Sequence, residues 1–225
     1  MPHVHVILAS ASPARLSTLR SAGVRPTVVV SSVDEDAVLA AARERFGDLE
    51  PADAVLVLAQ AKAEDVAHRV EDEEASADML GVQVADAVVV GCDSMLELDG
   101  EALGKPADAD DAVARWQAMR GRSAVLHTGH WLVDLRDAER GGSGATLGAT
   151  SSTTVSFADI DDDEIAAYVA TGEPLQVAGA FTIDGIGGPY VERVEGDHHG
   201  VVGLSLPLLR ELLGEVGVPF RAVRS

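Results

Sequence analysis

The sequence predicts a single domain of the α/β class. Apolar runs of strand length alternate with stretches that carry helix-start and helix-stop residues. The 225 residues are enough to bury one core, and no Pro-rich or low-complexity segment divides the chain. The hydrophobic fraction of 47% is that of a globular protein, and with only 4% aromatic residues the core must be built from Val, Leu, Ile and Ala.

The formal charge of −20 argues against nucleic acid and anionic membranes as partners. The chain has 17 Lys and Arg residues against 37 Asp and Glu residues and no basic run, so it repels polyanions. A small anionic ligand is still compatible, because salt screens a distant acidic surface over about 10 Å at 0.1 M. The placement of the cations therefore matters more than their number.

The cysteine content favours a reducing compartment. Cys92 is the only cysteine, which excludes an intrachain disulfide and predicts a cytoplasmic protein. It has no adjacent base and is predicted to be a small buried hydrophobe. Residues 1–14 lack the basic start of a signal peptide, and no apolar run reaches membrane-spanning length.

The first strand, residues 4–9, is predicted to lead directly into a helix. Ser12 suits the N-cap, Pro13 the first helical position and Gly23 the end. A helix that starts this close to a strand end offers free N–H groups to an anion. Arg15 lies in the first turn, where the helix dipole favours an acid. It either accompanies a bound anion or points into solvent, and taken alone the feature favours solvent.

The next segment contains acidic residues and one lysine. Residues 28–30 predict a second strand, followed by acids at residues 34–36 that either bind a divalent cation or open a helix. Residues 51–70 predict an Ala-rich helix in which Lys62 is the only lysine, and on this pattern alone it is expected to be solvated. Residues 71–74 are an acidic run, predicted to be an exposed helix end or loop.

Residues 87–90 are continuously apolar and β-branched, which predicts a strand covered on both faces. We expect this strand to end at Asp93. Ligands bind beyond the carboxyl ends of strands in open α/β sheets. Asp93 is therefore a candidate catalytic carboxylate.

A hairpin is predicted to bring a base to this carboxylate. Asp99 and Gly100 form a two-residue turn signal, and counting outward from the turn pairs Ser94 with Lys105. Lys105 is then expected beside Asp93. The two are either a surface ion pair, worth about 0–1 kcal/mol, or a functional pair, and the buried strand favours function.

The later elements are predicted by the same signals. They are a helix capped by Asp108 and ending at Arg120, a strand over residues 125–135, a helix over residues 165–170 capped by Asp161, and a closing helix over residues 204–213. Residues 136–154 are rich in Gly, Ser and Thr and are predicted to be a long connection before a strand near Val155.

Two later patterns allow a functional or a structural interpretation. His127 and His130 lack a third ligand at metal spacing and are expected to be structural. The Gly-rich residues 178–188 permit either close backbone approach to a ligand or simple turns. Residues 197–199, an Asp followed by two His, are either a metal site or, as such runs usually are, an exposed loop.

Several short motifs occur together in a characteristic order. They are Leu8-Ala9-Ser10-Ala11-Ser12-Pro13-Ala14-Arg15, Ser32-Val33-Asp34-Glu35, Lys62 in its Ala-rich helix, Val90-Gly91-Cys92-Asp93-Ser94, Gly104-Lys105-Pro106, Gly172-Glu173-Pro174, Ala178-Gly179-Ala180-Phe181 and Val201-Val202-Gly203-Leu204. On these motifs the chain resembles, nearly end to end, the Maf family of septum formation-related nucleoside triphosphate pyrophosphatases.

The resemblance implies a mixed, bent β-sheet flanked by helices, with two lobes around a nucleotide-binding cleft, as in Maf and inosine triphosphatase proteins. Residues 1–225 would form this one domain. The resemblance further implies a nucleoside triphosphate as substrate, Mg²⁺ or Mn²⁺ as cofactor and a homodimer. Its functional residues fall on Asp93 as proton acceptor, on Glu35 and Asp93 as metal ligands, and on Lys62, Lys105, Ser10 and Arg15 around the triphosphate. In the implied reaction a water attacks the α-phosphorus and pyrophosphate leaves.

Three positions linked to base selection depart from the pyrimidine-preferring members. Ala14, Ser94 and Asp184 stand where those members usually have Arg, Thr and Gln. The Asp184 carboxylate only accepts hydrogen bonds, which favours a base edge that presents N–H groups. The expected substrates are dTTP, UTP or modified nucleotides.

Two alternatives stay open at this level. One is a house-cleaning pyrophosphatase for purine nucleotides such as ITP or XTP, which a comparison of substrates separates from the first interpretation. The other is a non-enzymatic regulator of cell division that offers its acidic surface to a partner protein.

Overall fold

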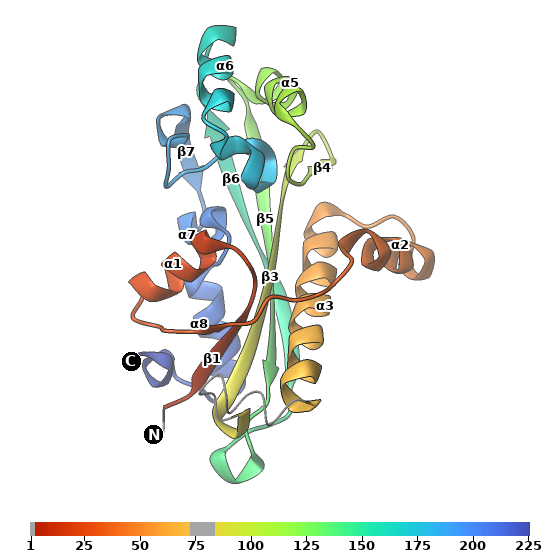
Figure 1. Ribbon diagram of the computed structural model, residues 1–225, viewed down its shortest axis with the longest axis vertical. Coiled ribbons are helices and arrows are strands. Elements are labelled where there is room, and N and C mark those ends of the chain that lie inside the picture. Colours follow the sequence, from red (N-terminus) through yellow and green to blue (C-terminus); the bar gives the residue numbers. More distant parts are fainter. Residues whose placement is uncertain (1–2, 73–83) are drawn as a thin grey trace.

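The structure, a computed structural model, describes residues 3–72 and 84–225 and is built around a mixed β-sheet (Figure 1). The strands are β1 (His5–Ala9), β2 (Thr27–Val28), β3 (Ala87–Leu98), β4 (Glu101–Leu103), β5 (Ser123–Asp134), β6 (Thr146–Phe157) and β7 (Val191–Glu195). The α-helices in these ranges are α1 (Pro13–Ser21), α2 (Glu35–Phe46), α3 (Pro51–Asp72), α5 (Ala109–Met119), α6 (Asp162–Ala170), α7 (His198–Val202) and α8 (Leu206–Glu215).

The sheet joins a parallel part to an antiparallel part. The strand order is β2-β1-β3-β5-β6-β7, and β4 pairs with β3 outside this path. β1 is parallel to both β2 and β3, whereas β3, β5, β6 and β7 follow one another antiparallel. The predicted α/β class with a mixed sheet is confirmed.

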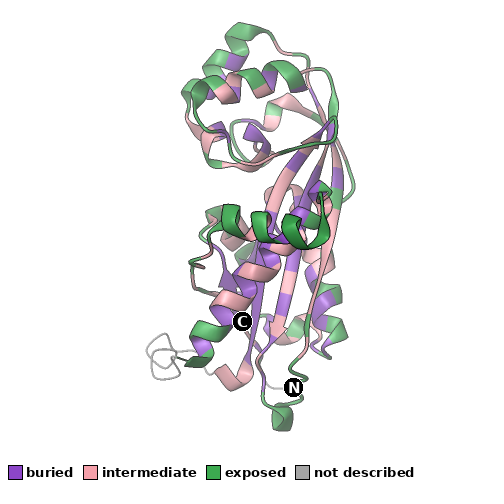
Figure 2. Ribbon diagram, turned by 90° about the vertical axis from the view of Figure 1, so that its right-hand side faces the viewer, coloured by how far each residue is buried: buried purple, intermediate pink, exposed green. Residues whose placement is uncertain are grey.

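The helices pack on two parts of the sheet and form two lobes, which share the long strands β3, β5 and β6 (Figure 1). In the lower lobe, Val88 and Val90 of β3 pack in the core with α8, while Ala87 and Val89 pack with α3 on the other face. The upper lobe has its own core around Trp116, to which β3, α5 and α6 contribute. Figure 2 shows the buried strands enclosed by helices whose outer faces are exposed.

The local signals for helix starts and for the hairpin are confirmed. Ser12, Asp108 and Asp161 are the N-caps of α1, α5 and α6, and each side chain accepts a hydrogen bond from the backbone N–H three residues later. Asp99 and Gly100 have φ angles of 56° and 82°. Such left-handed pairs close two-residue hairpins. The β3–β4 register is the one counted from the turn, with Leu98 opposite Glu101 and Leu96 opposite Leu103.

The prediction of a long connection over residues 136–154 is wrong. Residues 146–157 form β6, which pairs with β5 from Thr146 to Ser156. Thr favours strands, and Gly148 is required by packing, because a Cβ there would lie 2.2 Å from the Trp131 ring. Turn-forming Ser and Gly residues concealed this strand from pattern reasoning.

Two smaller expectations are also adjusted. The second strand is β2, two residues long, and Val30 beyond it is 53% exposed. Of the acidic run over residues 71–74, Glu71 and Asp72 form the exposed end of α3, while Glu73 and Glu74 lie outside the described residues. None of the helices in the described part of the chain has both the length and the apolar character that crossing a bilayer requires.

His127 and His130 both make internal contacts. Buried His130 is bonded through Nδ1 to the Thr128 carbonyl at 3.0 Å and accepts the Ser205 N–H at Nε2 at 2.8 Å. Both contacts suit a neutral ring, and burial lowers the pKa of His130 to about 4. His127 bridges a carboxylate of β3 and a hydroxyl of β6 at 2.8 Å each.

The backbone of α3 lies directly on the sheet at two glycines. A Cβ built on Gly91 would be 2.3 Å from the Ala59 carbonyl oxygen, and one on Gly129 would be 2.3 Å from the Val55 carbonyl oxygen. Only residues without a side chain permit this approach. The contact holds the middle of α3 against β3 near Asp93.

We predict that Gly129→Ala lowers the free energy of unfolding by about 1–3 kcal/mol, because the added methyl overpacks a backbone contact. Denaturant unfolding monitored by circular dichroism measures the change. Gly104→Ala is the matched control, since a Cβ there meets nothing within 4 Å. Equal stability of the two variants would contradict the close contact of α3 with the sheet.

Candidate functional site

The site lies where the edge of β3 is open. Pairing of β1 with β3 ends at Ala9 opposite Gly91, and pairing of β4 begins at Leu103 opposite Leu96. Across the described ranges, residues 92–95 therefore have no strand neighbour on this side of β3. Side chains and a helix start surround this gap.

Asp93 does not follow the end of its own strand, as the sequence predicted. β3 continues to Leu98, and Asp93 stands within it opposite Gly129 of β5. Pairing with β5 and with the hairpin keeps the chain extended past the apolar residues. The strand that ends beside Asp93 is β1, so the carboxylate still lies at a strand terminus, but at that of its neighbour.

Lys62 connects the two carboxylates of the site. Its Nζ atom lies 2.5 Å from Asp93 Oδ1 and 2.7 Å from Glu35 Oε1. Lys62 and Asp93 are each only 8% exposed, whereas the Glu35 side chain is 53% exposed. Lys62 is thus a buried member of the site, in contrast to the solvated lysine expected from its helix alone.

The surroundings of Asp93 make its carboxyl group harder to ionise than that of an ordinary aspartate. Burial raises the pKa of Asp93, although the charges of Lys62 and Arg15 act in the opposite direction. A carboxylate with a raised pKa is a stronger base than an ordinary aspartate. The direction of this pKa shift suits Asp93 to accepting a proton.

Asp65, which the sequence analysis missed, anchors the segment before Glu35. Its carboxylate accepts the Ser32 N–H at 2.9 Å and the Ser32 hydroxyl at 3.0 Å. Asp34 then caps α2 by accepting the Ala37 N–H. The available signal was the position of Asp65 three residues after Lys62 on one helix, since residues at this spacing are surface neighbours.

Arg15 is engaged by the protein and does not point freely into solvent. Its Nε donates to the Gly203 carbonyl at 2.8 Å, Nη1 to Ser10 Oγ at 3.1 Å and to the Cys92 carbonyl at 2.8 Å, and Nη2 to Ser94 Oγ at 3.1 Å. Four of its five N–H donors are thus used. Arg15 joins the loop after β1, the open edge of β3 and the end of α7.

The start of α1 offers backbone donors beside this clamp. The N–H groups of Ala11 and Ala14 donate to no acceptor within the residues described. Half-buried Ala14 is at the second position of the helix, where such groups and the dipole attract anions. Its methyl group adds no polar contact of its own.

Lys105 does not form the ion pair with Asp93 that the hairpin count predicted. Its side chain is exposed, and within the described ranges it makes no salt bridge; the cation beside Asp93 is Lys62. The strand ladder stops at Leu103, so the register does not extend to Lys105. Arg115 anchors the loop by donating to the Gly104 carbonyl at 2.7 Å.

Asp197 caps α7, which begins at His198, so residues 197–199 are not the loop that was expected, although His198 is exposed. Their ligand atoms lie within 4.8 Å of one another. The Asp197 carboxylate, however, already accepts the N–H groups of His199 and Gly200 as the N-cap of α7. The arrangement is explained as a helix cap.

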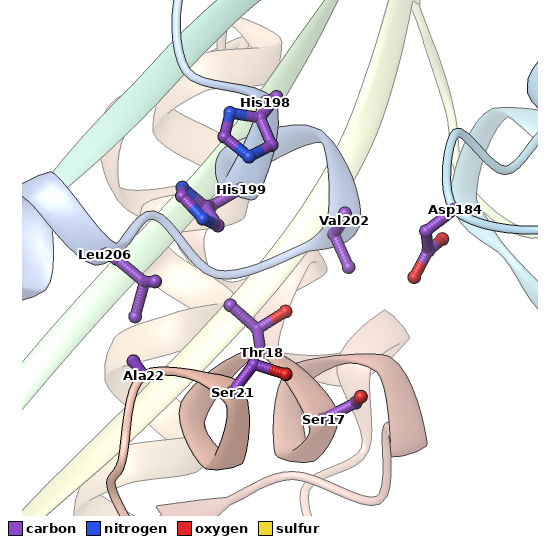
Figure 3. A pocket seen from close by; sticks show the side chains of 9 residues that line it. All are labelled: Ser17, Thr18, Ser21, Ala22, Asp184, His198, His199, Val202 and Leu206. Atoms are coloured by element: carbon purple, nitrogen blue, oxygen red, sulfur yellow. The ribbon is translucent and has the colours of Figure 1, made fainter.

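A pocket of about 290 Å³ opens between the two lobes (Figure 3). Its lining residues are Ser17, Thr18, Ser21, Ala22, Asp184, His198, His199, Val202 and Leu206. The Asp184 carboxylate points toward this space from the upper lobe, across from Ser17 of α1. The structure therefore brings Lys62, Asp93 and Glu35 together and leaves Asp184 at a pocket that they do not line.

Two carboxylates share an ammonium group beside a helix start with free N–H donors, and this arrangement is suited to a phosphorylated ligand. A two-lobed α/β protein with a pocket between its lobes carries this site. The sequence profile described as Maf-like protein matches residues 5–216, and the chain belongs to this family.

Relatives cover nearly the full length of the chain. A protein of Salinispora tropica is 52% identical over 222 residues, which are 99% of this chain and 88% of that protein. A protein of Streptomyces coelicolor is 52% identical over 216 residues, covering 96% and 92%, and one of Rhodococcus jostii is 54% identical over 215 residues, covering 94% and 92%. Each of the three is named nucleoside triphosphate pyrophosphatase.

Proposed function

We propose that the protein hydrolyses nucleoside triphosphates to nucleoside monophosphate and pyrophosphate. The observation that carries this proposal is the buried Lys62, held between Asp93 and Glu35 beside the open edge of β3. The name shared by the relatives supports the same activity.

Glu35 and Asp93 are the residues that would hold a divalent cation. Each uses one oxygen on Lys62, and Asp93 Oδ2 and Glu35 Oε2 accept no hydrogen bond from the residues described. Carboxylate oxygens are the donors that Mg²⁺ and Mn²⁺ prefer, so the donor set fits. When bound, such an ion supplies Lewis-acid polarisation of phosphate oxygens and neutralises their charge.

Residues of the protein accept the proton of the attacking water and offset the negative charge of the triphosphate. Asp93 accepts a proton from water, while Lys62 keeps the carboxylate oriented through Oδ1. The water oxygen bonds to the α-phosphorus, the bond from that phosphorus to the bridging oxygen breaks, and pyrophosphate leaves. The free N–H groups at the start of α1, together with Lys62 and Lys105, stabilise the negative charge. Arg15 supports them by fixing Ser10 and Ser94 in place.

Asp93→Asn is expected to reduce pyrophosphate release at least about 100-fold, because the base is lost. In the wild-type protein kcat/KM should fall as the pH is lowered through a pKa above the ordinary 3.8 of aspartate, since only the deprotonated carboxylate accepts the proton. The variant should lack this dependence.

A coupled pyrophosphate assay across pH measures both effects. Asp110→Asn, an exposed acid in the first turn of α5, is the control and should behave as wild type. Near-wild-type release by Asp93→Asn from every triphosphate would contradict the role of Asp93.

We also propose that Asp184 selects the base in the pocket of Figure 3. A carboxylate that faces N3 of the base favours uracil and thymine, which present N3–H there, over cytosine, whose N3 is an acceptor at that position. The proposed substrates are therefore dTTP, UTP or modified nucleotides. A higher kcat/KM for ITP or XTP would instead support the purine alternative.

We predict that Asp184→Gln lowers the ratio of kcat/KM for UTP to that for CTP by about tenfold, because the amide can donate as well as accept. Steady-state kinetics with both nucleotides measures this ratio. An unchanged ratio would remove Asp184 from base selection.

Other expectations stay predictions. They are the cytoplasmic location, the homodimer and the absence of nucleic-acid and membrane partners. Retained nucleotide binding without turnover of any triphosphate, with either Mg²⁺ or Mn²⁺, would favour the non-enzymatic division regulator.

A further inference from the structure

Asp184 stands on a loop without regular secondary structure. Residues 181–187 form bends and turns between two short 3₁₀ segments, and Asp184 and its two following residues are exposed. A loop of this kind presents a side chain reproducibly only if its backbone is fixed from outside. The carboxylate of Glu173 holds the backbone of this loop in place.

The carboxylate of Glu173 is the centre around which the loop folds. Its Oε1 accepts hydrogen bonds from Thr182 Oγ1 at 2.5 Å, from the Gly187 N–H at 3.0 Å and from the Tyr168 hydroxyl at 3.1 Å. Its Oε2 accepts the Ile186 N–H at 2.9 Å. The donors lie on both sides of Asp184 in the sequence.

The fit around this carboxylate is tight. A Cβ on Gly185 would lie 2.4 Å from Glu173 Oε2, and one on Gly187 would lie 2.3 Å from the buried Tyr168 hydroxyl. Partial burial opposes ionisation of Glu173, but hydrogen bonds from Thr182 and the two backbone N–H groups outweigh it and lower the pKa. Glu173 is therefore an anion at neutral pH, bound by its own loop in the manner of a ligand.

We infer that Glu173 is a positioning residue for base selection, which acts through Asp184 and does not touch the substrate. The inference rests on the proposed function, because it assigns to Glu173 the task of holding the base-reading carboxylate at the pocket. It also gives the Gly172-Glu173-Pro174 motif a physical task.

Glu173→Gln separates this role from simple packing. Glutamine has nearly the same shape but replaces one acceptor oxygen with an amide donor. Whichever way the amide turns, an NH₂ group faces a donor of residues 182–187. The loop must then rearrange, while the Lys62–Asp93 pair on the other elements is untouched.

The experiment compares kcat/KM for UTP and for CTP. Glu173→Gln is expected to lower the UTP-to-CTP ratio by about tenfold, mainly through KM for UTP, with kcat at saturation nearly unchanged. In an Asp184→Asn background the same substitution should change the ratio no further, since residues that act through one another are not additive. Hydrogen exchange should also show faster exchange of the Ile186 and Gly187 amides.

Asp162→Asn is the control, because it alters a carboxylate in the same lobe that pairs with Arg120 at 2.7 Å and makes no hydrogen bond to the loop. It should leave the ratio unchanged. An equal loss of kcat/KM for both nucleotides in Glu173→Gln, or an additive effect with Asp184→Asn, would overturn the inference. If the wild-type protein released no pyrophosphate, the proposed function would fail, and equilibrium binding of UTP and CTP would test Glu173 in place of kinetics.

Discussion

The contact between the backbone of α3 and the sheet is the constraint on which the site depends. Gly91 and Gly129 let the helix approach closer than any side chain would allow. Lys62 lies between Ala59 and Ala63, the two residues that touch Gly91, and Gly91 is two residues from Asp93. A charged group buried this deeply is tolerated only when it is paired, and the ammonium group meets two carboxylates at hydrogen-bond distance. The close packing of α3 on the sheet thus places the Lys62 ammonium group beside the carboxylates of Asp93 and Glu35.

The site combines paired charges with an interruption of the sheet. The ammonium group of Lys62 lies between two carboxylates, and the charge of Arg15 also acts on Asp93. Where β1 ends, the edge of β3 is free for Arg15 instead of another strand. The hydrogen bonds of Arg15 join three segments of the protein. The backbone N–H donors at the start of α1 remain available to an anion. The reacting groups are consequently few and rigidly supported.

Local signals in the sequence predicted local structure well. Caps such as Ser12 and the turn at Asp99 need only nearby residues, and the structure has both. The largest failures depend on partners distant in the chain. β6 is a strand because β5 lies beside it. Lys62, which its helix alone predicted to be solvated, is buried by contacts with β3 and α2, and the four donors that meet at Glu173 leave no periodic pattern. The family motifs indicated which residues belong to the candidate site, but not how their side chains are arranged in space.

The central claim is that water attacks the α-phosphorus at a site organised by Asp93 and Lys62. Its most direct test is hydrolysis of UTP in water enriched in ¹⁸O, with mass spectrometry of both products after a single turnover. The arrangement predicts one ¹⁸O atom in the nucleoside monophosphate and none in pyrophosphate. Label in pyrophosphate, or release of inorganic phosphate with a nucleoside diphosphate, would contradict it, because the attack would then fall on a different phosphorus.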